Sequence, residues 1–218
     1  ASCQKSGRKA SDVKIVAVTK TRTAEQINEA VSLGITDIGE NRVQELLEKY
    51  DLVTKDVNWH IIGHLQTNKV KYMASFVSLI HSVDSLKLLK EINKQALKAG
   101  RVIDVLLQLH VAAEETKFGL TQHEVVEMLE SDDFIALKNV RVVGLMAMAT
   151  NTEDEEQVAM EFESVRQFYH VLKDGYFSGK PEFKEISMGM SGDYLIAQKY
   201  ESTLVRVGSS IFGERIYE

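Results

Sequence analysis

The chain has 218 residues, with 26 Lys and Arg against 32 Asp and Glu, and a formal net charge of −6. This length allows one domain with a substantial core, and the excess of acids gives no general attraction to nucleic acid or to an anionic membrane. The single Cys3 excludes an internal disulfide and a zinc site built from cysteines. The longest apolar run, around Val142 to Ala149, is far too short to span a membrane. We therefore expect a single-domain cytoplasmic protein.

Residues 1–12 form a polar N-terminal segment that includes Lys5, Arg8 and Lys9. Its basic, serine-containing composition is faintly similar to the end of a transit peptide, so a mitochondrial location stays open, but a solvated polar end is the simpler interpretation. The folded domain is expected to cover residues 13–218.

The domain begins with a strand-like run at residues 13–20, which is short, apolar and rich in β-branched residues. A capping box from Thr23 to Gln26 then starts a helix that ends near Gly34. The same order repeats along the chain. Further strands are predicted at 36–39, 57–62, 77–81, 102–109, 140–148, 185–188 and 203–207, and further helices at 42–50, 67–74, 85–99, 122–129, 153–172 and 193–200. The helix at 153–172 is expected to begin at a Thr152 cap.

Alternating strands and helices indicate right-handed βαβ units and a parallel sheet. Eight such units in a chain of this length favour an α/β fold of the compact (β/α)8 TIM-barrel type. An open, doubly wound sheet is the alternative, because one wrongly predicted strand would leave seven.

In a TIM barrel the site lies at the carboxyl ends of the strands. Two Gly- and Ser-rich segments, 188–192 and 206–210, follow the last two predicted strands, where barrels of this type bind phosphate through backbone N–H groups and hydroxyls. Glycine and serine also make plain turns, which is the alternative for either segment alone.

Two cations are predicted to point into the barrel mouth. Lys20 has the same strand parity as Val16 and Val18, and Arg206 has that of Leu204. A partly desolvated lysine amine can attack a carbonyl, so this pair beside a phosphate loop suits an anionic ligand that carries an aldehyde. A lysine at a strand end can also simply extend toward solvent. His60 and His64 straddle a strand end, and we do not expect them to bind a metal.

Several segments together resemble the pyridoxal 5'-phosphate homeostasis proteins, also called the proline synthase co-transcribed homologues. The resemblance spans about residues 13–213, and its most specific block is the eleven-residue run from Trp59 to Lys69. The other segments that carry it are 16–20, 39–45, 115–119, 186–191 and 202–213. This family is similar to the N-terminal barrel of alanine racemase.

The resemblance implies a cofactor, pyridoxal 5'-phosphate, and assigns residues to it. Lys20 matches the lysine that forms the Schiff base, and Arg206 matches the arginine that faces the pyridine nitrogen. Ser191, Gly208 and Ser209 match the phosphate loops, and many relatives have threonine in place of Ser209. Asn41 and His64 are expected in the mouth, close to the cofactor. Should Lys20 not be the bonded lysine, Lys117 is the nearest alternative.

The resemblance also implies a function in vitamin B6 homeostasis, in which the protein stores and delivers the cofactor and so serves amino-acid metabolism indirectly. Related racemases take a second base from another domain and the opposite subunit, and this chain ends at Glu218, soon after the last strand. We therefore expect a monomeric binding protein, with apo forms of pyridoxal-phosphate enzymes as recipients. A small single-domain amino-acid racemase is the alternative, and a third is a barrel that binds another phosphorylated metabolite.

Overall fold

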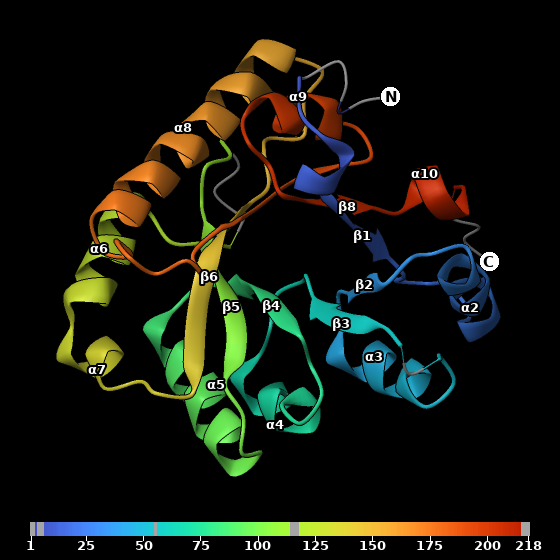
Figure 1. Cartoon of the computed structure of the whole chain (residues 1–218), viewed down its shortest axis with the longest axis horizontal. Helices are drawn as coiled ribbons and strands as arrows, with labels where there is room; N and C mark the ends of the chain where they lie inside the picture. The colour runs from blue at the N-terminus through green and yellow to red at the C-terminus, as the bar shows by residue number, and fades with distance from the viewer. Residues whose placement is uncertain (1–2, 4–6, 55, 114–117, 215–218) are drawn as a thin grey trace.

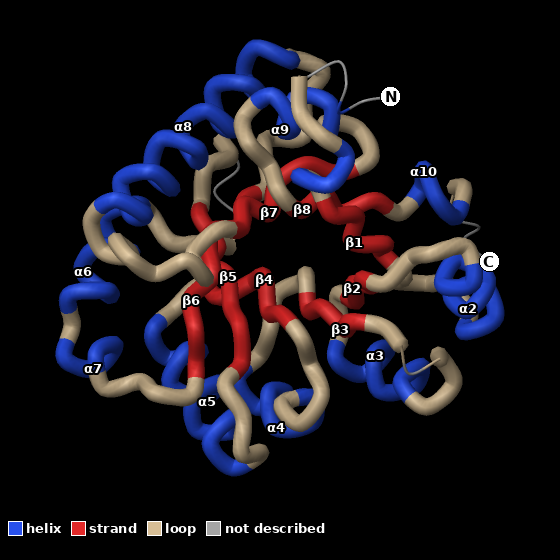
Figure 2. The backbone as a smooth tube through the Cα atoms, in the orientation of Figure 1, coloured by secondary structure: helices blue, strands red, loops and turns tan. Residues whose placement is uncertain are grey.

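The strands of the chain close into a parallel barrel with helices around its outside (Figures 1 and 2). The computed structural model describes residues 3, 7–54, 56–113 and 118–214. Within them, eight strands pair in chain order and the last returns to the first. The strands are β1 Lys14–Val18, β2 Asp37–Glu40, β3 Asn58–Ile61, β4 Leu79–Val83, β5 Ile103–Leu109, β6 Val140–Ala147, β7 Glu185–Met190 and β8 Leu204–Val207. The predicted TIM barrel is confirmed, and the open sheet is wrong.

The helices from α2 to α9 connect successive strands on the outer face of the barrel, and α10 follows the last strand (Figure 1). They are α2 Ala24–Ser32, α3 Val43–Tyr50, α4 Val70–Met73, α5 Leu86–Lys98, α6 Gln122–Glu130, α7 Asp132–Ile135, α8 Glu155–Asp174, α9 Tyr194–Lys199 and α10 Ser209–Phe212, with short 3-10 turns η1 Ala10–Asp12 and η2 Thr67–Lys69. Their amphipathic stripes pack against the strands, and this outer layer contains most of the buried apolar side chains.

The start of α8 and the bounds of β4 differ from the sequence-based expectation. The helix cap is Asp154 and not Thr152, because the Asp154 carboxylate accepts hydrogen bonds from the backbone N–H groups of Glu156 and Gln157 and so starts α8 two residues later. Strand β4 begins at Leu79, whereas residues 77–81 were predicted. The register between β4 and β5 shifts between Ile80 and Val83, so the regular alternation of side chains is interrupted there.

A second, smaller apolar cluster fills the barrel interior. It contains Val16, Ile62, Leu79, Leu106, Val143, Met146 and Leu204, with Val18 and Met148 packed against it. Since Val16 and Val18 belong to this cluster, the inward face of β1 is the one that the strand parity predicts. The interior cluster therefore identifies inward-facing residues of β1, β4, β5, β6 and β8.

The N-terminal segment contacts the barrel near β8. The Arg8 guanidinium donates a 2.5 Å hydrogen bond to the Ser202 carbonyl, which ties the described part of the segment to the residues just before β8. No helix within the described ranges is long and apolar enough to cross a bilayer.

Candidate functional site

The carboxyl ends of β7, β8 and β1 form one sector of the barrel mouth. The strand register pairs Arg206 with Val16 on one side and with Met190 on the other. Ser191 and Gly208 follow Met190 and Val207 directly, and Lys20 follows two residues after the end of β1. The residues predicted on sequence grounds to hold a phosphate and an aldehyde therefore lie in neighbouring strands.

Lys20 lies in the turn after β1, where the backbone makes a sharp change of direction. Its side chain is half-buried. The next residue, Thr21, adopts the left-handed conformation with a φ of 64°, which non-glycine residues rarely adopt. The Thr21 N–H donates a 2.5 Å hydrogen bond to the Glu45 carboxylate, and the Thr19 N–H donates to the Gly39 carbonyl at 3.0 Å. The backbone is thus held on both sides of Lys20.

A buried ionic cluster behind β1 provides this support. The Lys49 ammonium group, on α3, donates 2.7 Å hydrogen bonds to the Thr19 carbonyl and to the carboxylates of Glu40 and Glu45. The Thr19 hydroxyl donates to the same Glu40 oxygen at 2.6 Å. Burial raises the pKa of Glu40, and its second carboxylate oxygen has no hydrogen-bond partner within the described residues. Sequence analysis missed this cluster, although the i,i+4 spacing of Glu45 and Lys49 was a visible signal.

Arg206 is almost completely buried and points into the interior of the barrel. Its guanidinium donates hydrogen bonds to the Ser187 carbonyl (2.8 Å), the Ser187 hydroxyl (2.6 Å) and the Ala147 carbonyl (2.9 Å). All three acceptors are neutral. Burial lowers the pKa of Arg206 to about 10, so the side chain is still a cation at neutral pH. These bonds use three of its five N–H groups, and the other two make no hydrogen bond within the described residues.

The two predicted phosphate loops are in direct contact. The Gly208 N–H donates to the Ser191 hydroxyl at 3.3 Å, which connects the segment after β7 to the segment after β8. Ser209 opens the short helix α10, so its N–H has no partner inside that helix. Gly189 has a φ of +95°, and an added Cβ would lie 2.7 Å from the Ala197 side chain, so glycine is needed where α9 crosses β7.

Asn41 and His64 lie in the adjacent sector, after β2 and β3. The register pairs Val18 with Gly39, so Asn41 follows β2 at the level where Lys20 follows β1. Both residues line a cavity of about 310 Å³ together with Arg42, Gln66 and Lys69, among others. The His64 ring is hydrogen-bonded to Asp84 at 3.1 Å and stacks on Phe118 with ring centroids 3.9 Å apart. His64 therefore orders the rim of the mouth in this structure.

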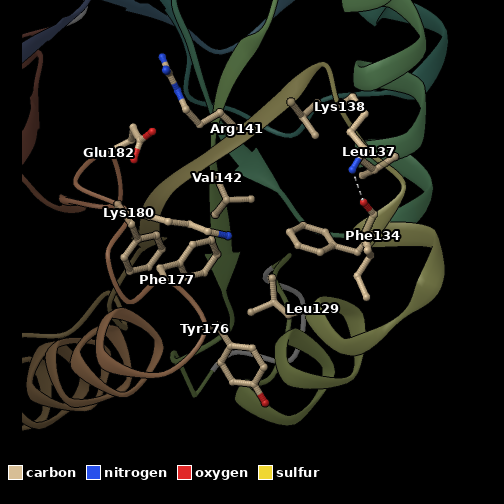
Figure 3. A pocket seen from close by; sticks show the side chains of 13 residues that line it. Leu129, Phe134, Leu137, Lys138, Arg141, Val142, Tyr176, Phe177, Lys180 and Glu182 are labelled. Atoms are coloured by element: carbon tan, nitrogen blue, oxygen red, sulfur yellow. Dashed lines mark hydrogen bonds between the residues drawn. The ribbon is translucent and has the colours of Figure 1, made fainter.

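Other features lie away from this sector. A groove of about 390 Å³ is lined by the start of β6 and the segment before β7, at the opposite end of the barrel (Figure 3). Its lining mixes aromatic side chains such as Phe134 and Phe177 with aliphatic and charged ones. No group of three or more His, Cys, Asp or Glu side chains in the described residues could hold a metal ion. Lys117, the alternative lysine, lies outside the described residues.

The mouth thus combines an amine, a buried guanidinium, and hydroxyl and N–H groups from two glycine-containing loops. The hydroxyl and N–H groups can hold the phosphate of a small phosphorylated molecule. The guanidinium can face a hydrogen-bond acceptor on a ring, and the amine can bond to a carbonyl carbon. The sequence predicted these groups, but it did not predict their supports. The partners of Arg206 and the ionic cluster behind Lys20 depend on which strands and helices lie side by side.

Comparisons with known proteins agree with this fold. Residues 3–216 match the family described as "Alanine racemase, N-terminal domain". A protein of Aquifex aeolicus named "Pyridoxal phosphate homeostasis protein" is 41% identical over 99% of this chain and 92% of its own length. PipY of Synechococcus elongatus PCC7942, solved without and with PLP, is 30% identical and covers 97% of both chains, with TM-scores of 0.87 and 0.84. Alanine racemase of Clostridium difficile 630 shares only the fold: it is 14% identical at a TM-score of 0.70, and this chain covers 56% of it.

Proposed function

Because the chain belongs to the pyridoxal phosphate homeostasis protein family, we propose that it binds pyridoxal 5'-phosphate in the mouth of its barrel and serves the homeostasis of this cofactor. The observation that carries the proposal is that Lys20, Arg206 and the Ser191–Gly208 contact occupy one sector, at the ends of β1, β8 and β7. The PLP-bound structure of PipY, whose fold this chain shares over nearly its whole length, supports it.

The chemistry of the residues fits the three functional groups of the cofactor. Its phosphate needs N–H and hydroxyl donors, which Ser191, Gly208 and Ser209 offer. Its ring nitrogen needs a donor or a charged neighbour, and Arg206 has two N–H groups that no described residue uses. Its aldehyde needs an amine, which is the role of Lys20.

In this proposal the Lys20 amine forms a Schiff base with the cofactor: its nitrogen bonds to the carbonyl carbon, and the carbonyl oxygen leaves as water. The bound cofactor supplies an electron-withdrawing ring. A guanidinium beside the ring nitrogen disfavours protonation of that nitrogen, which weakens the ring as an acceptor of electrons. We infer that this arrangement suits holding and delivering the cofactor better than converting amino acids.

All proposed ligands lie on one barrel. We therefore propose a monomer as the binding unit, and apo forms of pyridoxal-phosphate enzymes as recipients.

The experiment compares wild type with Lys20→Ala, after loading with pyridoxal phosphate and exhaustive dialysis, by visible absorbance and by counting the retained cofactor. We expect wild type to keep one equivalent with a visible band. Lys20→Ala should lose the band and bind roughly tenfold or more weakly, since the phosphate loops remain. Lys98→Ala, which removes an exposed lysine on α5, is the matched control. A visible band that persists in Lys20→Ala, or a wild type that retains no cofactor, overturns the proposal.

A further inference from the structure

A continuous chain of buried polar side chains crosses the barrel interior beneath the mouth. Asp37 on β2 is 3.1 Å from His60 Nε2 on β3, and His60 Nδ1 is 2.9 Å from His81 Nε2 on β4. On the far side of the barrel, His81 Nδ1 is 2.9 Å from the Ser187 hydroxyl on β7, which accepts a hydrogen bond from Arg206 at 2.6 Å. The chain thus joins five strands and ends at the guanidinium proposed to face the cofactor.

Every member of this chain is at most 3% exposed. TIM-barrel interiors are usually filled by branched apolar side chains, so five polar residues in one barrel core are unexpected. A buried polar network that is only partly hydrogen-bonded destabilises a protein more than apolar residues would, so the pairing must be complete. Here each ring nitrogen of both histidines has a partner.

The direction of each hydrogen bond follows from the two ends of the chain. Burial raises the pKa of Asp37, but hydrogen bonds from His60 and Thr36 outweigh it and hold that pKa at about 2. Asp37 is therefore a carboxylate, which only accepts, so His60 Nε2 carries a proton. At the other end, the described contacts of the Ser187 hydroxyl are Arg206, which has only donors, and His81 Nδ1, so the hydroxyl hydrogen goes to His81 Nδ1. Burial keeps the pKa of His81 well below its usual value, so neutral His81 has its proton on Nε2 and donates it to His60 Nδ1.

We propose that Asp37, His60, His81 and Ser187 are positioning residues for Arg206, forming a hydrogen-bond chain in which every donor points from Arg206 toward Asp37. The hydrogen of the Ser187 hydroxyl is committed to His81, so its oxygen presents only lone pairs to Arg206. The guanidinium is then fixed by neutral acceptors and presents its positive charge to the mouth. The effect on the cofactor rests on the proposed function. The direction of the hydrogen bonds is a property of the protein alone.

The Asp37 end reaches a charged cavity at the opposite end of the barrel. This cavity, of about 340 Å³, is lined by Asp37 and His60 and by the ionisable side chains of Lys14, Asp104, Arg141, Glu182, Lys184 and Glu185. Lys14 lies 3.5 Å from the Asp37 carboxylate, to which Asn58 also donates at 3.2 Å. Four intervening hydrogen bonds thus connect this end to Arg206.

Nitrogen NMR of cofactor-free protein shows which nitrogen of each imidazole carries a proton, and therefore tests the direction of the hydrogen bonds. In wild type at neutral pH we expect both His60 and His81 to be neutral, with the proton on Nε2. Asp37→Asn keeps the size of the side chain but allows either an oxygen or an NH₂ group to face His60, so His81 should become a mixture of tautomers. The matched control is Asp104→Asn, which removes a carboxylate from the same cavity but lies off the chain. It should leave both histidines unchanged.

A second measurement connects the chain to the mouth. The dissociation constant of pyridoxal phosphate should rise about five-fold in Asp37→Asn and stay constant in Asp104→Asn, as expected of residues that act through others.

A wild-type His81 with its proton on Nδ1, a protonated His60 at neutral pH, or an Asp37→Asn spectrum identical to wild type overturns the proposed order. The wild-type spectrum decides this even if the variant does not fold. Failure of wild type to bind the cofactor would overturn the proposed function and leave the tautomer result standing.

Discussion

Arg206 is a buried cation whose described hydrogen bonds all go to neutral acceptors. An unpaired charge in a protein interior is costly, and burial accordingly lowers the pKa of Arg206 to about 10. We infer that the positive charge of Arg206 serves the function of the site, because its burial costs free energy. In the proposed function, that charge limits protonation of the cofactor ring, which separates the role of Arg206 from the covalent role of Lys20.

This separation predicts distinct spectra. Arg206→Ala should still give the visible band, because Lys20 is intact, but the ring nitrogen can then protonate more readily. The wavelength of the visible band should therefore shift with pH in Arg206→Ala, over a range of about 5 to 9 in which we expect the ring nitrogen to titrate. The wild-type band should stay constant over the same range. An absorbance titration measures this.

Arg141→Ala is the control for Arg206→Ala, since Arg141 pairs with Asp104 at the other end of the barrel. It should behave as wild type. If the band of Arg206→Ala is as independent of pH as that of wild type, Arg206 does not face the ring nitrogen.

At the scale of elements, helix α3 holds the turn that carries Lys20. Lys49 binds the Thr19 carbonyl and both Glu40 and Glu45, and the Lys49 and Glu40 side chains are 10% and 0% exposed. Removing one partner of a buried ion pair leaves the other charge without compensation. The contribution of this cluster should therefore appear in stability as well as in cofactor binding.

Lys49→Met should lower the free energy of unfolding at pH 8 by about 3 kcal/mol. Without Lys49 the raised pKa of Glu40 should rise further, so the folded state takes up a proton before the unfolded state does. The loss of stability should then shrink as pH falls from 8 toward 5. Urea unfolding at both pH values measures the difference. In Lys90→Met, which breaks an exposed pair with Asp133, the change should be under about 1 kcal/mol. An equal loss in the two variants contradicts a supporting role for Lys49.

The sequence predicted the elements well where local signals decide them. The capping box at Thr23 starts α2, and the β-branched run of β1 lies where it was expected. The short helices α7 and α10 were missed, because four residues give too little periodicity to recognise. The start of α8 was misplaced because Thr152 and Asp154 are both good caps, and only the folded backbone selects between them.

At the scale of the whole molecule, strict alternation of strands and helices was enough to predict a closed barrel, and strand parity was enough to place Val16, Val18 and Leu204 on its inner face. The hydrogen-bond chain from Asp37 to Ser187 could not be predicted in this way. Its consecutive members are separated by 21 to 106 residues along the sequence. Their contacts depend on the relative register of β2, β3, β4 and β7, which no local pattern specifies.

The central claim is that Lys20 bonds covalently to pyridoxal phosphate in the barrel mouth. Borohydride reduction of the loaded protein tests it, because hydride adds to the carbon of the carbon–nitrogen double bond, a proton adds to the nitrogen, and the link becomes permanent. Digestion and mass spectrometry then locate it. We predict the reduced pyridoxyl phosphate group on the peptide that contains Lys20 and on no other. A label on another lysine, such as Lys117, or the absence of any label after reduction would contradict the claim.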